Sequence, residues 1–178
     1  LLLISDYLTK WYVHNNYELG ESVSVIGNFI RLTYVRNSGI AFGMFQNFGD
    51  VLSYLIPIAI FILLLIFYKT NDKNFLIKLA FLWIIVGAFG NFIDRILYGY
   101  VIDFVDIDFF NISINSFNIG EIQFSGYDLD RWPAFNIADS LISCGVVLLC
   151  IDAIINNEST AVKEEIEMER QKDASCIN

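Results

Sequence analysis

An uncharged run of 18 apolar residues, VLSYLIPIAIFILLLIFY at 51–68, restricts the fold of this chain more than any other feature. As an α-helix this run rises about 27 Å, which nearly spans the roughly 30 Å hydrocarbon core of a bilayer. Three further apolar segments lie at 1–13, 76–97 and 134–155. Because 56% of the residues are hydrophobic, against roughly 45–50% in soluble domains, we predict an all-α membrane protein with four transmembrane helices.

The distribution of charge orients these spans. The link at 69–75, KTNDKNF, carries two lysines, and the positive-inside rule therefore places it in the cytoplasm. With four spans, both termini are then cytoplasmic, and the segments 14–50 and 98–133 lie on the outer side of the membrane. Residues 1–155 are predicted to form one integral membrane domain, followed by a charged cytoplasmic tail at 156–178.

Both outer segments are expected to carry secondary structure of their own. Residues 22–37, SVSVIGNFIRLTYVRN, alternate and are rich in β-branched and aromatic residues, which predicts short strands. The segment 111–132 is polar, with an aromatic residue every few positions. We expect either a short interfacial helix or a hairpin there.

Composition disfavours several classes of function. The formal net charge of −9 argues against binding to nucleic acid. The chain has a single histidine, His14, and no CxxC motif or His/Cys cluster, so neither a metal site nor a cofactor is predicted. Nothing in the sequence near His14 supports a role as the base of a serine or cysteine nucleophile.

Polar residues inside the apolar segments are the strongest functional signal. An ionisable group within a membrane costs roughly 2.5–3.5 kcal/mol on insertion scales, so such groups persist where they are paired, hydrated or used. Residues separated by three or four positions share one face of a helix. Three sets have this spacing: Asn91 with Asp94 and Arg95, Asn136 with Asp139, and Asp6 with Lys10.

Topology brings two of the acids to one membrane surface. Asp103 follows the third span by a short turn, and Asp139 lies at the start of the fourth, so the two are expected to meet near the outer boundary of the lipid. Two close carboxyls in a low-dielectric site share a proton, which makes one a base and the other an acid. Aspartic proteases use this arrangement. Nearby Asn and Arg side chains would hold the substrate, and Asp94 would neutralise the charge of Arg95.

Other interpretations of the same acids stay open. Asp94 and Arg95 also suit a structural ion pair between helices, and Asp6 with Lys10 is more typical of structure than of chemistry. Asp106 and Asp108 are expected to be solvated loop acids. A pair of acids also suits a proton- or cation-coupled transporter, although such proteins place acids near the bilayer midplane and often contain repeats. A structural subunit, in which polar residues only hold helices together, is a third possibility.

Several short motifs occur together in one order along the chain. Taken with the four spans, they make the sequence resemble the bacterial lipoprotein signal peptidase family, also called signal peptidase II, over about residues 4–155. The motifs are DYLTK (6–10), RNSGIAFGMF (36–45), GNFIDR (90–95), VIDF (101–104) and FNIADS (135–140).

The resemblance implies a definite activity. Members of this family are membrane-embedded aspartic endopeptidases of the bacterial cytoplasmic membrane, with the active site at the outer leaflet. They remove signal peptides from prolipoproteins, cutting just before a cysteine that already carries a diacylglyceryl group. The resemblance therefore implies lipidated prolipoproteins and membrane lipid as partners, and inhibition by globomycin-type cyclic peptides. We expect a monomer.

The resemblance also implies roles for individual residues. The catalytic dyad falls on Asp103 and Asp139, and Asp94 supports the site by ion pairing. Asp6 and Lys10 match a D-x-x-T-K motif as supporting residues. Residues expected to line or support the substrate pocket are Asn37, Gly39, Asn91, Arg95 and Asn136. Residues 21–50 would form a small extracytoplasmic β-cradle. Part of 105–130, which is longer here than is usual in the family, would form an interfacial helix or flap.

Overall fold

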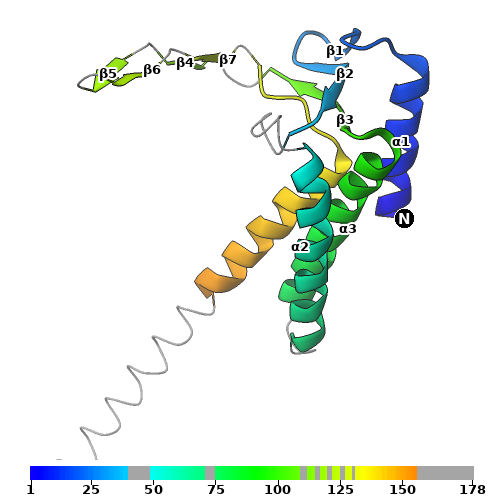
Figure 1. Ribbon diagram of the computed structural model, residues 1–178, viewed down its shortest axis with the longest axis vertical. Coiled ribbons are helices and arrows are strands. Elements are labelled where there is room, and N and C mark those ends of the chain that lie inside the picture. The colour runs from blue at the N-terminus through cyan, green and yellow to red at the C-terminus, as the bar shows by residue number, and fades with distance from the viewer. Residues whose placement is uncertain are drawn as a thin grey trace, which may run out of the picture.

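The computed structural model describes residues 1–39, 49–70, 75–108, 112–114, 117–119, 122–124, 127–129 and 131–155; at 49–53 and in the four ranges between 112 and 129 it describes the backbone alone. The predicted tail at 156–178 and part of the predicted cradle, 40–48, lie outside the described residues. Figure 1 shows a group of helices with a small sheet at one end and a narrow ribbon of strands leaving that sheet.

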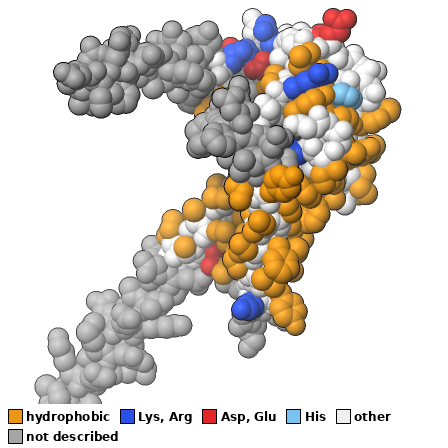
Figure 2. All heavy atoms as spheres, in the orientation of Figure 1, with side chains coloured by type: hydrophobic (Ala, Val, Ile, Leu, Met, Phe, Trp, Pro, Cys, Tyr) orange, Lys and Arg blue, Asp and Glu red, His pale blue; other side chains and the backbone are white. Residues whose placement is uncertain are grey.

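Four helices account for the four predicted apolar segments. They are α1 (Leu2–Asn16), α2 (Gly49–Lys69), α3 (Phe75–Tyr98) and a last helix, Ile137–Ile155. Among the described residues, α3 and the last helix are long and apolar enough to cross a membrane by length and composition. Figure 2 shows hydrophobic side chains covering the helices, while most charged side chains in this view gather around the sheet.

The last helix begins three residues later than predicted. Residues 131–136 are not helical, because Phe135 pairs with a strand of the sheet and Asn136 caps the helix. Pro57 lies inside α2 without ending it, which membrane helices tolerate.

Two glycines of α3 allow close contact with neighbouring helices. A Cβ atom at Gly87 would collide with the carbonyl oxygen of Ala138, and one at Gly90 would lie 2.6 Å from Asp6 Oδ2. Small residues at such contacts let membrane helices approach closely enough to pack backbone against backbone. Gly90 therefore admits a charged side chain of α1 to the contact between α3 and the last helix.

The sheet at the end of the helices has three antiparallel strands in the order β1–β2–β3. Strands β1 (Ser22–Ile26) and β2 (Ile30–Asn37) lie within the predicted 22–37 segment, and β3 is Val101–Ile107. A core of Val13, Tyr34, Ile102 and Phe104 packs α1 against β2 and β3. The third strand thus comes from the other segment that was predicted to lie outside the membrane, and it carries Asp103.

The ribbon consists of four three-residue strands: β4 (Ile112–Ile114), β5 (Phe117–Ile119), β6 (Ile122–Phe124) and β7 (Tyr127–Leu129). Strand β4 pairs with β7 and β5 pairs with β6, both antiparallel. All described partners fit a single antiparallel register, from Ile112 with Leu129 at one end to Ile119 with Ile122 at the other. The described residues of this segment are therefore those of a hairpin and not of an interfacial helix.

Candidate active site

Asp103 lies on β3 in a buried, amide-lined position. Its Oδ2 accepts a hydrogen bond from Asn37 Nδ2 at 3.0 Å, and its Oδ1 accepts one from Asn136 Nδ2 at 2.8 Å. Only 2% of the residue is exposed. Burial, followed by the negative charge of Asp139, raises the pKa of the Asp103 carboxyl to about 7.

Asp139 is held by the start of the last helix. Asn136 is the N-cap: its Oδ1 accepts the Asp139 N–H at 2.9 Å, and Asp139 Oδ2 accepts the Asn136 N–H at 3.2 Å. This reciprocal pair is a capping box with an aspartate in the third helical position. Asn91 Nδ2 donates to the other oxygen, Asp139 Oδ1, at 2.7 Å. The local helix start therefore determines the orientation of the carboxylate.

Asn136 links the two predicted catalytic acids directly. It donates to Asp103 through its Nδ2 and caps the helix that carries Asp139. Its side chain is fully buried, and the same Nδ2 also lies 3.0 Å from Asn91 Oδ1. The structure thus brings both acids to one amide network built from β3, α3 and the last helix.

A buried lysine supports this network from α1. Lys10 Nζ lies 2.9 Å from Asp6 Oδ2 and 3.0 Å from Asp94 Oδ2, and it donates to Asn91 Oδ1 at 2.9 Å. Asp94 also accepts the N–H of Ile102 at 3.0 Å. The ion pair of Asp94 is therefore with Lys10, while its charge also acts on Arg95 together with those of Asp139 and Asp103. Asp94 pairs with Lys10 because its side chain is directed toward α1 and β3.

Arg95 holds the end of β2 beside the acids. Its Nη2 donates to the carbonyl oxygen of Gly39 at 2.6 Å, and the Gly39 N–H donates to Asn37 Oδ1 at 3.0 Å. Its guanidinium is close enough to Asp103 and Asp139 to interact with both charges. Asn37 and Gly39 are therefore parts of the network and not only turn residues.

Asp106 and Arg131 form a second polar site, which the sequence did not single out. Asp106 was expected to be a solvated loop acid, but it lies on β3, is 9% exposed and contacts Arg131 Nε at 2.6 Å. Arg131 also lies 3.2 Å from Asp108, which is thus paired as well. One signal was available, since Arg131 is the single cation among the six acids of residues 99–133.

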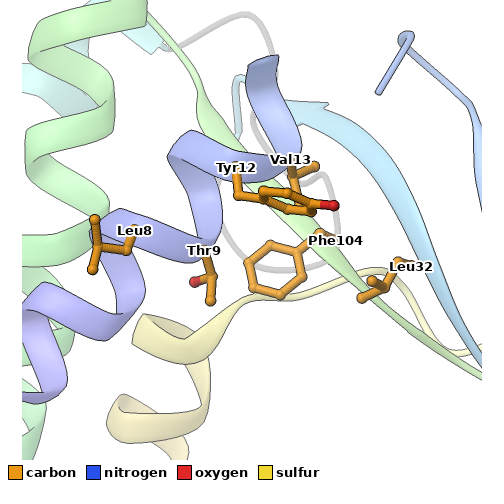
Figure 3. Close-up of a pocket in the computed structure, with 6 residues that line it drawn as sticks. All are labelled: Leu8, Thr9, Tyr12, Val13, Leu32 and Phe104. Atoms are coloured by element: carbon orange, nitrogen blue, oxygen red, sulfur yellow. The ribbon is translucent and has the colours of Figure 1, made fainter. Parts of the chain in front are cut away.

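An apolar cavity of about 270 Å³ lies between α1 and the sheet (Figure 3). Its lining residues are Leu8, Thr9, Tyr12, Val13, Leu32 and Phe104. Phe104 follows Asp103 on β3, and successive strand residues project to opposite faces. The cavity therefore lies behind the strand from the acids. In the part of the chain that the structure describes, no cluster of three His, Cys, Asp or Glu side chains could hold a metal ion.

The arrangement of helices and sheet is found in solved proteins. Two structures of bacterial membrane enzymes determined by the in meso method are similar to this chain. The first has a TM-score of 0.71 and 31% identity, covering 88% of this chain and 84% of the other. The second has a TM-score of 0.68 and 32% identity, covering 85% and 86%. The fold is therefore that of a bacterial membrane enzyme.

Sequence comparison identifies the family. The family model described as "Signal peptidase (SPase) II" matches residues 1–155. The chain is 44% identical to the lipoprotein signal peptidase of Wigglesworthia glossinidia brevipalpis over 124 residues, 68% of this chain and 80% of the relative. It is 39% identical to that of Fusobacterium nucleatum subsp. nucleatum over 164 residues, 92% and 87% of the two chains. The chain belongs to the signal peptidase II family.

Proposed function

We propose that this member of the signal peptidase II family is an aspartic endopeptidase whose dyad is Asp103 and Asp139. Family membership supports the general activity, removal of signal peptides from lipoproteins by a protease of the bacterial inner membrane. The observation that carries the catalytic assignment is the shared amide of Asn136, which contacts Asp103 and caps the helix at Asp139.

The environments of the two acids suggest how they divide the chemistry. The pKa of Asp103 is raised to about 7, so this acid would hold the shared proton up to about that pH. Asp139 accepts two N–H hydrogen bonds at a helix N-terminus, where the helix dipole favours negative charge. Asp139 would therefore act as the base, and Asp103 as the acid.

The cleavage step follows from this assignment. Asp139 takes a proton from water as the water oxygen bonds to the carbon of the scissile carbonyl, while Asp103 gives its proton to the carbonyl oxygen. The tetrahedral intermediate then breaks its C–N bond as Asp139 gives its proton to the leaving nitrogen and Asp103 takes back a proton from the hydroxyl that becomes the product carbonyl, which restores both acids. Arg95, whose buried Nε has no hydrogen-bond partner among the described residues, would bind the substrate backbone.

We further propose the arrangement of the chain in the membrane. Helix α3 ends at Tyr98 and the last helix begins at Ile137, so the network lies where these helices meet one surface. With four spans, a cytoplasmic link at 69–75 and cytoplasmic termini, this surface is the outer one. The substrate is itself anchored in that leaflet by its signal helix and its lipid. Residues 1–155 would act as one monomeric domain that globomycin-type peptides inhibit.

The experiment that tests this function compares two substrates. Purified protein is incubated with a synthetic prolipoprotein that carries a diacylglyceryl cysteine, and with the same peptide without lipid. Mass spectrometry is expected to find a signal peptide and a product beginning with the lipidated cysteine, formed at least about ten times faster than from the unlipidated peptide. Intact lipidated substrate after incubation with folded protein would favour the transporter or structural interpretation instead.

The pKa of Asp103 predicts the alkaline limit of activity. The active dyad keeps one proton, and this proton is lost as the pH rises through about 7, so kcat should fall about tenfold per pH unit well above that value. The same raised pKa means that the folded state binds this proton more tightly than the unfolded state, so stability declines from the ordinary pKa of a carboxyl up to about 7. Initial rates from pH 5 to 9 measure the limit, and a constant kcat up to pH 9 would contradict the assignment.

A further inference from the structure

Arg131 makes four contacts with two separate segments, the end of β3 and the turn between β1 and β2. Its Nε donates to Asp106 Oδ1 at 2.6 Å, and its Nη2 lies 3.4 Å from the Asp106 carbonyl oxygen. Its Nη1 donates to the carbonyl oxygen of Asn28, in the turn between β1 and β2, at 2.9 Å, and to Asp108 at 3.2 Å. The guanidinium is 22% exposed, so solvent screens these contacts only in part.

The Asp106 side of this contact is anchored across the whole sheet. Asp106 Oδ2 accepts a hydrogen bond from Thr33 Oγ1 at 2.8 Å, and Thr33 Oγ1 lies 2.8 Å from Ser22 Oγ. These residues belong to β3, β2 and β1 in that order. Arg131 therefore contacts one end of a row of hydrogen-bonded side chains that crosses all three strands.

The segment that follows Arg131 runs along β3 to the candidate active site. The Trp132 N–H donates to the Ile107 carbonyl at 2.9 Å, and Phe135 exchanges N–H···O bonds with Val105 at 2.7 and 3.0 Å. The next residue is Asn136, which contacts Asp103. The segment thus lies antiparallel to β3, with Arg131 opposite Asp106 and Asp108 at one end and the acid network at the other.

Arg131 lies at the base of the hairpin that joins the two sides of this alignment. Residues 109–130, which include the pairs β4–β7 and β5–β6, separate Asp108 from Arg131, and the described hairpin pair nearest to Arg131 is Ile112 with Leu129. A guanidinium bonded to a carboxylate and to two backbone carbonyls is a directional contact that a lysine does not reproduce.

We propose that Arg131 is a positioning residue for the dyad, which fixes the strand carrying Asp103 in register with the segment leading into Asp139. This role rests on the proposed function. Arg131 does not touch the acids. It acts through Asp106, three residues beyond Asp103 on β3, and through residues 132–136 on the other side.

The test compares Arg131→Gln and Arg131→Lys with wild type and with Arg31→Gln. Arg31 is the register partner of Asp106 on β2, so its substitution removes one positive charge from the same sheet without touching the segment 131–136. The measurements are kcat and KM on the lipidated prolipoprotein, and thermal stability. The kcat is also followed against pH to locate the alkaline limb, the pH range above neutral in which kcat falls. The charged groups that act on Asp103 are Asp139 from the last helix, Lys10 from α1 and Arg95 from α3, and all three stay in every variant.

The sign of the pH shift separates positioning from simple loss of charge. Losing a nearby cation raises the pKa of a carboxyl, whereas separating Asp103 from Asp139 and admitting water lowers it. For Arg131→Gln we expect kcat to fall about tenfold, KM to change less than about threefold, and the alkaline limb to move down by about 0.5 to 1 pH unit. Arg131→Lys keeps the charge but should move the limb in the same direction, and Arg31→Gln should leave it in place or move it up.

The outcomes separate this inference from the proposed function. An alkaline limb at the wild-type position in both Arg131 variants, even with lower kcat, would overturn the positioning role, because loss of folded protein alone lowers kcat without moving the limb. Should Arg131→Gln not fold, Arg131→Lys carries the same test. Failure of wild type to cleave, or full cleavage by Asp103→Asn, would instead overturn the proposed function, and this role with it.

Discussion

Asp103→Asn and Asp139→Asn are each expected to lower kcat on a lipidated prolipoprotein by at least about 10³-fold, because each removes one partner of the proton exchange. Both changes keep the size of the side chain. Each also places an amide NH₂ where the carboxyl accepted two N–H donors, at a cost of about 1–3 kcal/mol. Cleavage rate and thermal stability in detergent are therefore measured together.

A matched control makes this result specific. Glu18→Gln removes a carboxylate from the exposed turn that precedes β1, and it should leave both rate and stability unchanged. If Asp103→Asn or Asp139→Asn cleaves at the wild-type rate, the dyad is assigned wrongly. If both variants unfold instead of losing turnover, the acids stabilise the fold, as expected for a structural subunit whose polar residues only hold helices together.

Lys10→Met is expected to destabilise the protein by about 3–5 kcal/mol, because it leaves the buried carboxyls of Asp6 and Asp94 without their common cation. Lys10 also donates to Asn91 Oδ1, which directs the Asn91 NH₂ group toward Asp139. The variant should therefore lose activity even at temperatures where it stays folded. Chemical unfolding in detergent measures the first effect, and kcat of the folded fraction the second.

The control for Lys10→Met is the same substitution at Lys69, which is exposed at the end of α2 and should change the unfolding free energy by no more than about 0.5 kcal/mol. Adding Asp6→Asn and Asp94→Asn to Lys10→Met should recover part of the lost stability, because no buried charge then lacks a partner. If Lys10→Met is as stable as wild type, the ion pairs of Lys10 with Asp6 and Asp94 do not contribute to the free energy of unfolding.

Sequence reasoning predicts the helices of this fold well, and the sheet and the hairpin in part. The apolar segments at 51–68 and 76–97 become α2 and α3 with small changes at their ends, because apolar runs of such length have few alternatives in lipid. The hairpin at 112–129 was one of two alternatives. The strand at 101–107 was not predicted as part of the sheet, because its partner β2 lies 64 or more residues earlier in the chain.

The candidate site shows the same division. The order of the motifs singles out Asp103 and Asp139, together with Asn37, Asn91 and Asn136. The roles of these residues stay predictions. Local spacing misled where two neighbours in sequence have different partners: Asp94 and Arg95 are adjacent, yet one contacts Lys10 of α1 and the other contacts Gly39. Asp106 likewise was expected to be a solvated loop acid, because the sequence does not show that Arg131 lies beside it.

By itself, the sequence determined that this chain would be helical, apolar and equipped with acids at the ends of two helices, because hydrophobic length and helical spacing are local properties. Only the tertiary structure decided which groups pair. Lys10 lies 81 residues from Asn91, and Asn136 lies 33 residues from Asp103. The partner of a buried charge is the group that close packing places within about 3 Å, and no local pattern specifies that distance.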